Sequence, residues 1–302
     1  MLLPQMAIFA QGTRAHYFLE FDVLPDVSPS QAVSAFARLR APEASSGGVN
    51  FVIAFGPDLW SAVASDRDPE NFKRLEPIAG TDGHTVPATP HDVWVWISGS
   101  EPDVTWEHAR ATRWLIADVA TLAAEQPAFT YRDSRDLTGF IDGTANPLSL
   151  TAPEVALVPA GQPGEGGSHV LAMRWLHDLD AFYRLRVHDQ EQVIGRKKSD
   201  SEELAEGVRP ATAHISRVQL DVAGKELELY RRSVPYGTQS EAGLYFVAFS
   251  SNPVRFGLLL ARMFGTSGDG VRDRLTDFSR PTSGATYFAP SLNALVALAG
   301  AG

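Results

Sequence analysis

Strand-like and helix-like segments alternate along this chain, and the same order of elements recurs in its two halves. In the first half, three apolar segments have the composition of β-strands, at residues 16–23, 49–55 and 92–97. A capping box at Ser28-Pro-Ser-Gln31, with proline at the first helical position, predicts a helix that runs to about residue 39. The apolar spacing over residues 103–124 predicts a second, longer helix.

The second half repeats this alternation. Strands are expected at residues 168–175, 227–231 and 244–250, and helical character at residues 178–192. Two helix starts are predicted, one at the capping box Ser199-Asp-Ser-Glu202 and one at Asn252-Pro253, the latter helix running to about residue 264.

Two runs of β-α-β-β-α-β character predict an α+β fold of duplicated ferredoxin-like domains, with antiparallel β-sheets and peripheral helices. The duplication is inferred from the order of elements, because the two halves show no residue-level repetition. Glycine and proline cluster at residues 159–167. We therefore expect an N-terminal domain at residues 1–150 and a C-terminal domain at residues 151–302.

The composition excludes several classes of function. The chain contains no cysteine, which rules out disulfides, thiolate catalysis, cysteine-bound zinc and iron–sulfur clusters. Its net charge of −10 argues against a nucleic-acid partner. The chain contains no run of about 18 apolar residues, so no membrane span is predicted. The first residues lack the basic start and cleavage site of a signal peptide. A cytoplasmic location is the resulting expectation.

One acidic residue stands in an unusual loop, Leu137-Thr-Gly-Phe-Ile-Asp-Gly-Thr-Ala-Asn-Pro147. Gly139 and Gly143 permit backbone geometries that are closed to other residues, so the loop can direct Asp142 into a cavity. The alternative is an ordinary turn in which Asp142 caps a backbone amide, since aspartate is common in turns.

Three further segments carry residues suited to a cofactor site. His214 lies in a semi-apolar stretch ahead of a strand, where it is either an axial haem ligand or a buried structural histidine. Arg231 and Arg232 are adjacent at the end of a strand, so strand alternation should turn one of them inward. Arg196 belongs to a basic segment that either clamps carboxylates or forms a surface patch.

Together these segments resemble the motifs of dye-decolorizing peroxidases, specifically the compact B-type branch. The loop Gly139-Phe-Ile-Asp-Gly-Thr-Ala-Asn-Pro147 is similar to the family's GxxDG motif. Ile194-Gly-Arg196, His214-Ile-Ser-Arg217 and Arg231-Arg-Ser-Val-Pro-Tyr-Gly237 follow in family order. Residues 273–279 and 282–290 resemble the family's C-terminal block. The resemblance spans nearly the whole chain.

The resemblance implies a role for each catalytic position. His214 is expected to be the iron ligand, and Asp142 and Arg231 the distal acid–base residue and the distal cation, with Ser233 a smaller distal polar group. A carboxylate should hold the other ring nitrogen of His214 and raise its basicity. Asp273 is the first candidate for that carboxylate, and Asp277 is the second.

The resemblance also implies one haem b per chain, between the sheet and the helices of the C-terminal half. Arg196 is expected to pair with a haem propionate, Phe246 to pack over the haem face, and Thr144 to contact the cofactor. Two positions depart from the commonest family pattern. Ala145 stands where many relatives have glutamate, and Ser233 where others have asparagine.

The expected function is that of a haem peroxidase, which reduces hydrogen peroxide and oxidises dyes, phenols or other small reductants by one-electron steps. The alternative is a haem-handling protein for storage, delivery or iron removal, which needs His214 and Arg196 but not Asp142 and Arg231. A cofactor-free scaffold is a third interpretation. A homo-oligomer is expected, whereas the short C-terminal segment gives no support for packaging inside an encapsulating shell.

Overall fold

The computed structural model describes residues 2–39, 48–219, 221–222 and 225–300, and it confirms the predicted α+β class. The first half contains β1 (Ala15–Val23), α1 (Pro29–Ala37), β2 (Asn50–Phe55), α2 (Pro57–Ala64), β5 (Val93–Gly99), α3 (Pro102–Leu115) and β6 (Ala120–Phe129), with the short β3 (Ile78–Ala79) and β4 (Thr85–Val86) before β5. The second half contains α4 (Ala152–Ala156), β7 (Ser168–His177), α5 (Leu179–Arg184), α6 (Val187–Ile194), α7 (His214–Val218), β8 (Asp221–Val222), β9 (Lys225–Glu226), β10 (Tyr230–Arg231), β11 (Val234–Gly237), β12 (Ala242–Ser250), α8 (Val254–Met263), β13 (Ser279–Ala289) and α9 (Leu292–Ala299).

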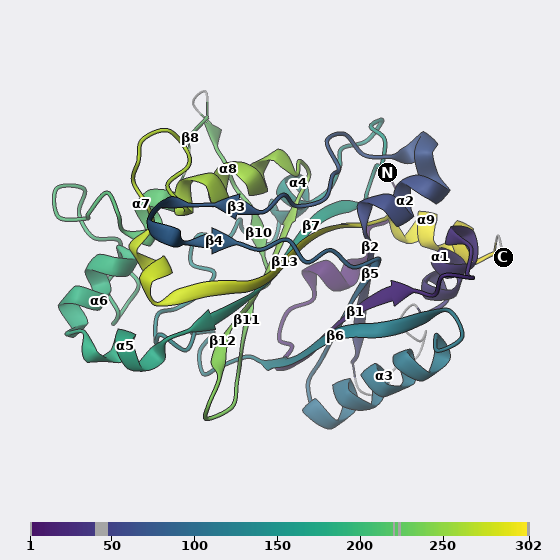
Figure 1. The fold of residues 1–302 in the computed structure, drawn as a ribbon, viewed down its shortest axis with the longest axis horizontal. Coiled ribbons are helices and arrows are strands. Elements are labelled where there is room, and N and C mark those ends of the chain that lie inside the picture. Colours follow the sequence, from purple (N-terminus) through teal and green to yellow (C-terminus); the bar gives the residue numbers. More distant parts are fainter. Residues whose placement is uncertain (1, 40–47, 220, 223–224, 301–302) are drawn as a thin grey trace.

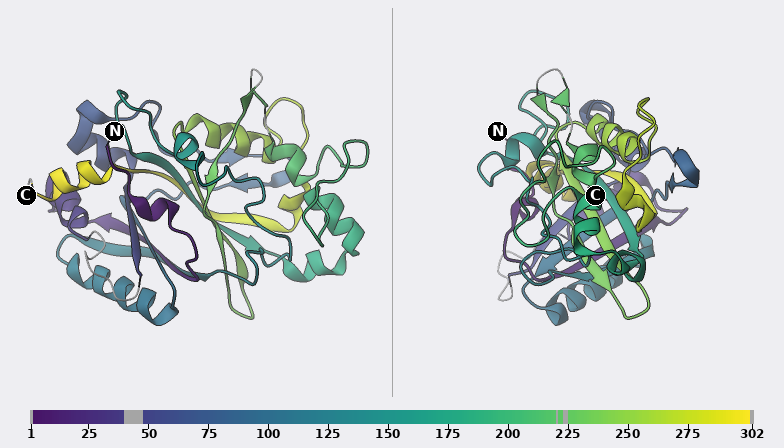
Figure 2. Two further views of the ribbon diagram at one scale, coloured as in Figure 1. Left: turned by 180° about the vertical axis from the view of Figure 1, so that it is seen from behind. Right: turned by 90° about the vertical axis from the view of Figure 1, so that its left-hand side faces the viewer.

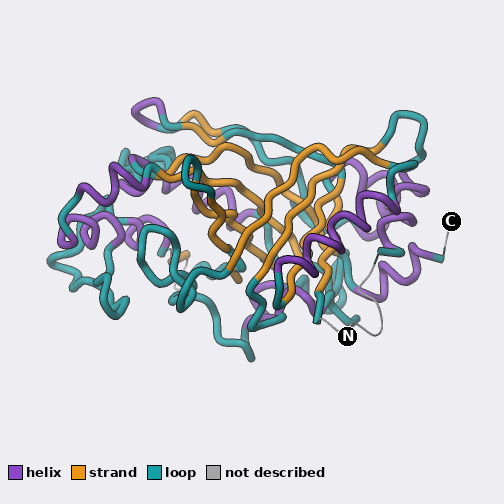
Figure 3. The backbone as a smooth tube through the Cα atoms, turned by 90° about the horizontal axis from the view of Figure 1, so that it is seen from below, coloured by secondary structure: helices purple, strands orange, loops and turns teal. Residues whose placement is uncertain are grey.

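Two antiparallel halves join into one large sheet in the order β10-β12-β7-β13-β2-β5-β1-β6, with β11 also paired to β12 (Figures 1 and 3). The halves meet at β13 and β2, where Phe288 pairs with Phe55. Helices α1 and α9 lie side by side at one end of the molecule, and α5 and α6 lie at the other (Figures 1 and 2). The last helix therefore packs on the first half of the chain.

The sheet curls so that strands of the two halves face each other across a shared core. Phe18 of β1 stacks on Tyr245 of β12, with ring centroids 3.9 Å apart, although four strands separate β1 from β12 in the sheet order. Trp94, Trp96 and Tyr287 lie in the same buried cluster. We call this cluster the barrel interior. Its residues come from both halves, so neither half buries it alone.

The outer face of each half is covered by helices. In the first half, the predicted capping box at Ser28 is present: Ser28 Oγ accepts from Gln31 N at 3.3 Å, and Gln31 Oε1 accepts from Ser28 N at 3.1 Å. In the second half, α8 begins directly after Asn252-Pro253, as predicted. Its buried residues Phe256 and Leu260 pack toward the outer face of β7 and β12.

Two helix predictions are wrong. The helix expected over residues 103–124 ends at Leu115, and residues from Ala120 onward form β6, because this segment pairs along the whole of β1. The capping box at Ser199 begins no helix. Ser201 has a positive φ of 63°, and Asp200 Oδ1 accepts from Glu202 N at 3.0 Å, so the local hydrogen bonds form a turn.

The described helices include none with the length and apolar character that a bilayer crossing requires.

Candidate active site

An apolar cavity lies between the outer face of β7 and β12 and the helices α7 and α8. Strand alternation directs Leu244 and Phe246 of β12 into it, while Tyr245 between them faces the barrel interior. Apolar side chains form most of its wall, namely Leu171, Met173, Trp175, Ile215, Leu229, Leu244, Phe246, Phe256, Leu260 and Met263. We call this space the active-site cavity.

Seven of the eight predicted site residues line this cavity, namely Asp142, Thr144, Arg196, His214, Arg231, Ser233 and Phe246. They come from segments up to about a hundred residues apart, and the fold brings them together. The eighth, Asp273, is fully buried and hydrogen-bonded to His214.

His214 begins α7, and its Nδ1 lies 2.6 Å from Asp273 Oδ2. Because Nδ1 is engaged by a carboxylate, Nε2 is the ring nitrogen left for a ligand bond. Asp273 is itself held in place, since its Oδ1 accepts from Leu275 N at 2.9 Å. Asp277, the second candidate, instead forms an ion pair with Arg272 at 2.8 Å.

The acidic loop is shaped by two glycines with positive φ, 88° at Gly139 and 80° at Gly143. A Cβ on Gly139 would meet only the far end of the Lys198 side chain, which can move, so the positive φ is what favours glycine at this position. Asp142 N donates to Ser134 O at 2.9 Å, and Asp142 Oδ1 accepts from Gly143 N at 2.7 Å. These bonds orient the Asp142 carboxylate.

Burial raises the pKa of Asp142 above its ordinary value, and the positive charge of Arg231 opposes that rise. Arg231 is the member of the arginine pair that lines the active-site cavity. Arg232 points elsewhere: it donates to Ile8 O at 2.8 Å, and its guanidinium lies 5.1 Å from the Trp96 ring centroid. A base and a cation are thus placed together on one wall.

Asn146, for which the sequence predicted no role, joins Arg231 to the acidic loop. Its Oδ1 accepts from Arg231 N at 3.0 Å, and its Nδ2 donates to Arg231 O at 2.8 Å. This paired bond links the loop of Asp142 to β10 across 85 residues of sequence. Asn146 lies within the GxxDG-like loop, but nothing in the local sequence indicates that its side chain binds a backbone 85 residues away.

Asp136 and His177 form a second pair that the sequence did not predict, and both lie at the cavity wall. Asp136 Oδ1 lies 3.1 Å from His177 Nε2, and Thr138 also donates to the carboxylate. Burial alone raises the pKa of Asp136, but His177 and Thr138 outweigh it and lower that pKa to about 2. Asp136 is therefore a fixed negative charge near Asp142, and this charge contributes to the raised pKa of Asp142.

Arg196 follows the left-handed Gly195 that ends α6. Its Nη2 forms an ion pair with Glu203 at 2.6 Å and its Nη1 donates to Ser201 O at 2.8 Å, whereas its buried Nε has no hydrogen-bond partner. Burial lowers the pKa of Arg196, and Glu203 opposes that shift. A guanidinium has five N–H donors, so Arg196 keeps N–H groups on Nη1 and Nη2 beyond the two that Ser201 and Glu203 receive.

A second cavity adjoins the first on the outer side of the acidic loop. The two cavities share Asp142, Gly143, Arg231 and Ser233. The second cavity extends to the exposed residues Gln11 and Arg14. We call it the vestibule. Small polar molecules can approach Asp142 and Arg231 from this side.

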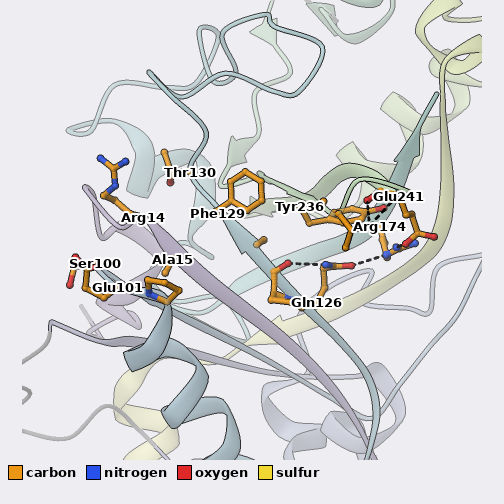
Figure 4. Close-up of a pocket in the computed structure, with 15 residues that line it drawn as sticks. Arg14, Ala15, Ser100, Glu101, Gln126, Phe129, Thr130, Arg174, Tyr236 and Glu241 are labelled. Atoms are coloured by element: carbon orange, nitrogen blue, oxygen red, sulfur yellow. Dashed lines mark hydrogen bonds and ion pairs between the residues drawn. The ribbon is translucent and has the colours of Figure 1, made fainter. Parts of the chain in front are cut away.

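A third cavity, drawn in Figure 4, lies beside β6 and β11 and shares only Arg14 and Thr130 with the vestibule. Its polar side chains bind one another: Arg174 Nε donates to Gln126 Oε1 at 2.8 Å, and the guanidinium forms an ion pair with Glu241. None of the predicted site residues, all of which the structure describes, lines it. We therefore assign the chemistry to the active-site cavity.

The fold and this cavity define an α+β enzyme in which a carboxylate-backed imidazole and an aspartate–arginine pair line one apolar space. The family models for Dyp-type peroxidases match residues 5–130, with the N-terminal domain, and residues 133–294, with the C-terminal domain. The chain therefore belongs to the Dyp-type peroxidase family and is a peroxidase, as the motifs predicted.

Individual relatives agree with this assignment. A dye-decolorizing peroxidase of Mycolicibacterium paratuberculosis is 35% identical over 269 residues, which are 88% of this chain and 76% of the relative. The crystal structure of a dyp-type peroxidase from Shewanella oneidensis has a TM-score of 0.92 and 32% identity, covering 98% of this chain and 99% of that one. A variant of DypB from Rhodococcus jostii RHA1 in complex with heme has a TM-score of 0.91 and 30% identity, covering 98% of both chains.

Proposed function

We propose that this protein reduces hydrogen peroxide and oxidises dyes, phenols or other small reductants one electron at a time, with haem b bound in the active-site cavity. The main support for this proposal is that the cavity is lined by His214, whose ring is held by the Asp273 carboxylate, and by the Asp142–Arg231 pair. A protein that only stores or delivers haem needs His214 and Arg196 and has no use for Asp142 beside Arg231. The peroxidase is therefore favoured.

The residues present suit haem. His214 offers one imidazole nitrogen while its other nitrogen is held by Asp273, which is a usual arrangement for a metal-binding histidine. The walls are apolar, as a macrocycle requires, and they include Phe246. Arg196 lines the cavity as a cation that can pair with a propionate, and Thr144 also lines the cavity.

Haem bound here supplies the redox centre that gives two electrons to hydrogen peroxide and recovers them singly from reductants. Asp142 accepts a proton from one oxygen of the peroxide and returns it to the other, which leaves as water. Arg231 stabilises the negative charge that develops on the departing oxygen. Ser233 lines both the cavity and the vestibule, and its Oγ accepts from Val247 N at 3.2 Å, so it adds a fixed polar group to this wall.

Absorption spectroscopy tests the proposed function directly. The protein is loaded with haem, and its spectrum is recorded before and after one equivalent of hydrogen peroxide. A Soret band that shifts within seconds and returns when a phenolic reductant is added is the expected result. A Soret band that only bleaches slowly contradicts the peroxidase and favours haem handling, and the lack of a Soret band contradicts haem binding altogether.

Asp273→Asn is expected to lower haem affinity or peroxide reactivity by about 10–100-fold, the usual cost of removing a residue that holds a metal ligand. The amide keeps the size of the side chain but presents no negative charge to His214 Nδ1. The affinity is measured by haem titration and the reactivity by stopped-flow absorption.

The matched control is Asp277→Asn, because Asp277 lies four positions away and pairs with Arg272 instead of His214. This variant is expected to resemble the wild type in both measurements. Equal losses in the two variants would show that the effect is general to this segment and would remove the special role of Asp273.

A homo-oligomer and a cytoplasmic location are further parts of the proposal. The oligomer is supported by large apolar side chains exposed on α3, where Trp106 is 54%, Trp114 77% and Leu115 62% exposed. The location is supported by the lack of cysteine, which fits a reducing compartment. Light scattering of the purified protein tests the first and cell fractionation the second.

A further inference from the structure

Two tyrosines and one glutamate form a hydrogen-bonded cluster in the barrel interior. Tyr245 Oη donates to Glu20 Oε1 at 2.9 Å, and Tyr287 Oη donates to Glu20 Oε2 at 2.9 Å. All three side chains are buried, with Tyr287 0%, Tyr245 3% and Glu20 6% exposed. The mechanism above uses none of them, although a carboxylate in a protein interior is costly and calls for an explanation.

Trp94 contributes a fixed donor to this cluster. The indole Nε1 can only donate, and it donates to Tyr245 Oη at 3.1 Å. The phenolic proton of Tyr245 is therefore free to point at Glu20. The Tyr245 oxygen thus has one donor on one side and one proton acceptor on the other.

Tyr245 is also next to the active-site cavity along the chain. Its neighbours on β12, Leu244 and Phe246, both line that cavity, and Tyr245 projects from the opposite face of the same strand. The thickness of one strand separates the two environments. An electron that leaves Tyr245 toward the cavity crosses a short, covalently continuous path.

We propose that Tyr245 is a one-electron redox site of this enzyme, with Glu20 as its proton acceptor. When peroxide has oxidised the haem and no reductant is present, Tyr245 gives one electron to the haem and its phenolic proton to the Glu20 carboxylate. The products are a neutral tyrosyl radical, a protonated Glu20 and a haem reduced by one electron. A small reductant later returns one electron to Tyr245, and Glu20 returns the proton. This inference rests on the proposed peroxidase function.

The surroundings suit this chemistry. Oxidised phenols lose their proton readily, and a buried phenol needs an acceptor within hydrogen-bond reach because bulk water is excluded. Burial raises the pKa of Tyr245 well above its ordinary value, so the phenol is its resting form and the proton must move with the electron. Burial also raises the pKa of Glu20, which makes its carboxylate a stronger proton acceptor than an exposed one. Trp94 Nε1 and the newly protonated Glu20 can then both donate to the radical oxygen.

Electron paramagnetic resonance of rapidly frozen holoenzyme tests the proposal. Haem-loaded protein is mixed with one equivalent of hydrogen peroxide without reductant, and absorption is recorded on the same samples. The wild type is expected to give a tyrosyl signal that narrows when the protein carries ring-deuterated tyrosine. Tyr245→Phe is expected to lose this signal, and Glu20→Gln to weaken it, because glutamine cannot take the proton.

Tyr17→Phe is the matched control. Tyr17 Oη also donates to a carboxylate, Glu125 Oε2 at 2.8 Å, but it faces away from the barrel interior and lies outside the active-site cavity. Its removal should leave the signal unchanged. If Tyr245→Phe does not fold, 3-fluorotyrosine placed at position 245 should add a fluorine splitting to the signal.

The outcomes separate this inference from the proposed function. An absorption response to peroxide with no radical, or with a radical that is unchanged in Tyr245→Phe, overturns the redox role of Tyr245 and leaves the peroxidase intact. A fluorotyrosine at position 245 that leaves the signal without fluorine splitting overturns the redox role as well. The lack of any absorption response overturns the peroxidase and this inference with it.

Discussion

Asp142→Asn is expected to lower the rate constant for reaction with hydrogen peroxide by about 10²–10⁴-fold, the range over which a positioned acid–base group contributes. The amide preserves the size of the side chain and can still accept from Gly143 N, but it cannot take a proton from peroxide. Stopped-flow absorption of the haem-loaded protein at several peroxide concentrations gives the rate constant. A variant that reacts at the wild-type rate would remove Asp142 from the mechanism.

The pH dependence of the same rate constant identifies the base. Burial raises the pKa of Asp142, and the mechanism needs its ionised form, so the wild-type rate should fall as the pH drops through that raised pKa. This fall on the acid side of the pH–rate profile, the acid limb, should therefore lie at a pH above the ordinary aspartate pKa of about 3.9. Asp142→Asn should lack this limb. An identical acid limb in both proteins would assign it to another group.

Arg231→Leu is expected to lower the rate constant for reaction with peroxide by about 10²–10³-fold, the usual cost of removing one charge-stabilising donor. Leucine fills part of the space but offers no charge to the departing oxygen. The measurement is again stopped-flow absorption. Arg231→Lys is the matched variant, because it keeps the charge and loses the forked donor geometry.

The two arginine variants are also expected to differ in the pH at which the acid limb falls. The charge of Arg231 lowers the pKa of Asp142, so Arg231→Leu should raise that pKa and move the limb to higher pH, whereas Arg231→Lys should leave it near its wild-type position. A slow Arg231→Leu enzyme with an unmoved limb would mean that Arg231 acts by positioning. If Arg231→Leu moves the acid limb but reacts with peroxide at the wild-type rate, the role of Arg231 in stabilising charge on the departing oxygen is contradicted.

Most secondary structure could be predicted because its causes are local. The Ser28 capping box and the strand patterns of β1, β2, β5, β7 and β12 depend on residues that are neighbours in sequence. Of the two failures, the helix predicted at Ser199 is replaced by a local turn in which Asp200 accepts from Glu202 N, whereas the helix predicted through residue 124 failed because a distant partner decided the outcome. Residues of β6 have apolar spacing that suits a helix, but pairing with β1 satisfies their backbone groups in a strand. The boundary between two domains near residue 150 stays a prediction.

The candidate site could be predicted only as a set of motifs. Their composition and order pointed to His214, Asp142 and Arg231, and the structure places these three at one cavity. No local pattern could reveal that Asn146 binds the backbone of Arg231. The pairing of Asp136 with His177 was equally invisible, because neither residue belongs to a recognisable motif.

By itself, the amino-acid sequence determined the α+β class, the family resemblance and the residue types available for chemistry, since these follow from local periodicity and from motif order. Tertiary structure places Arg231 at the cavity and Asp273 beside His214, which are the two choices that the family resemblance had favoured. It also decided that Glu20 meets Tyr245 across 225 residues of sequence. The physical reason is that the curl of the sheet and the packing of its two faces set these distances, and short-range patterns carry no information about either.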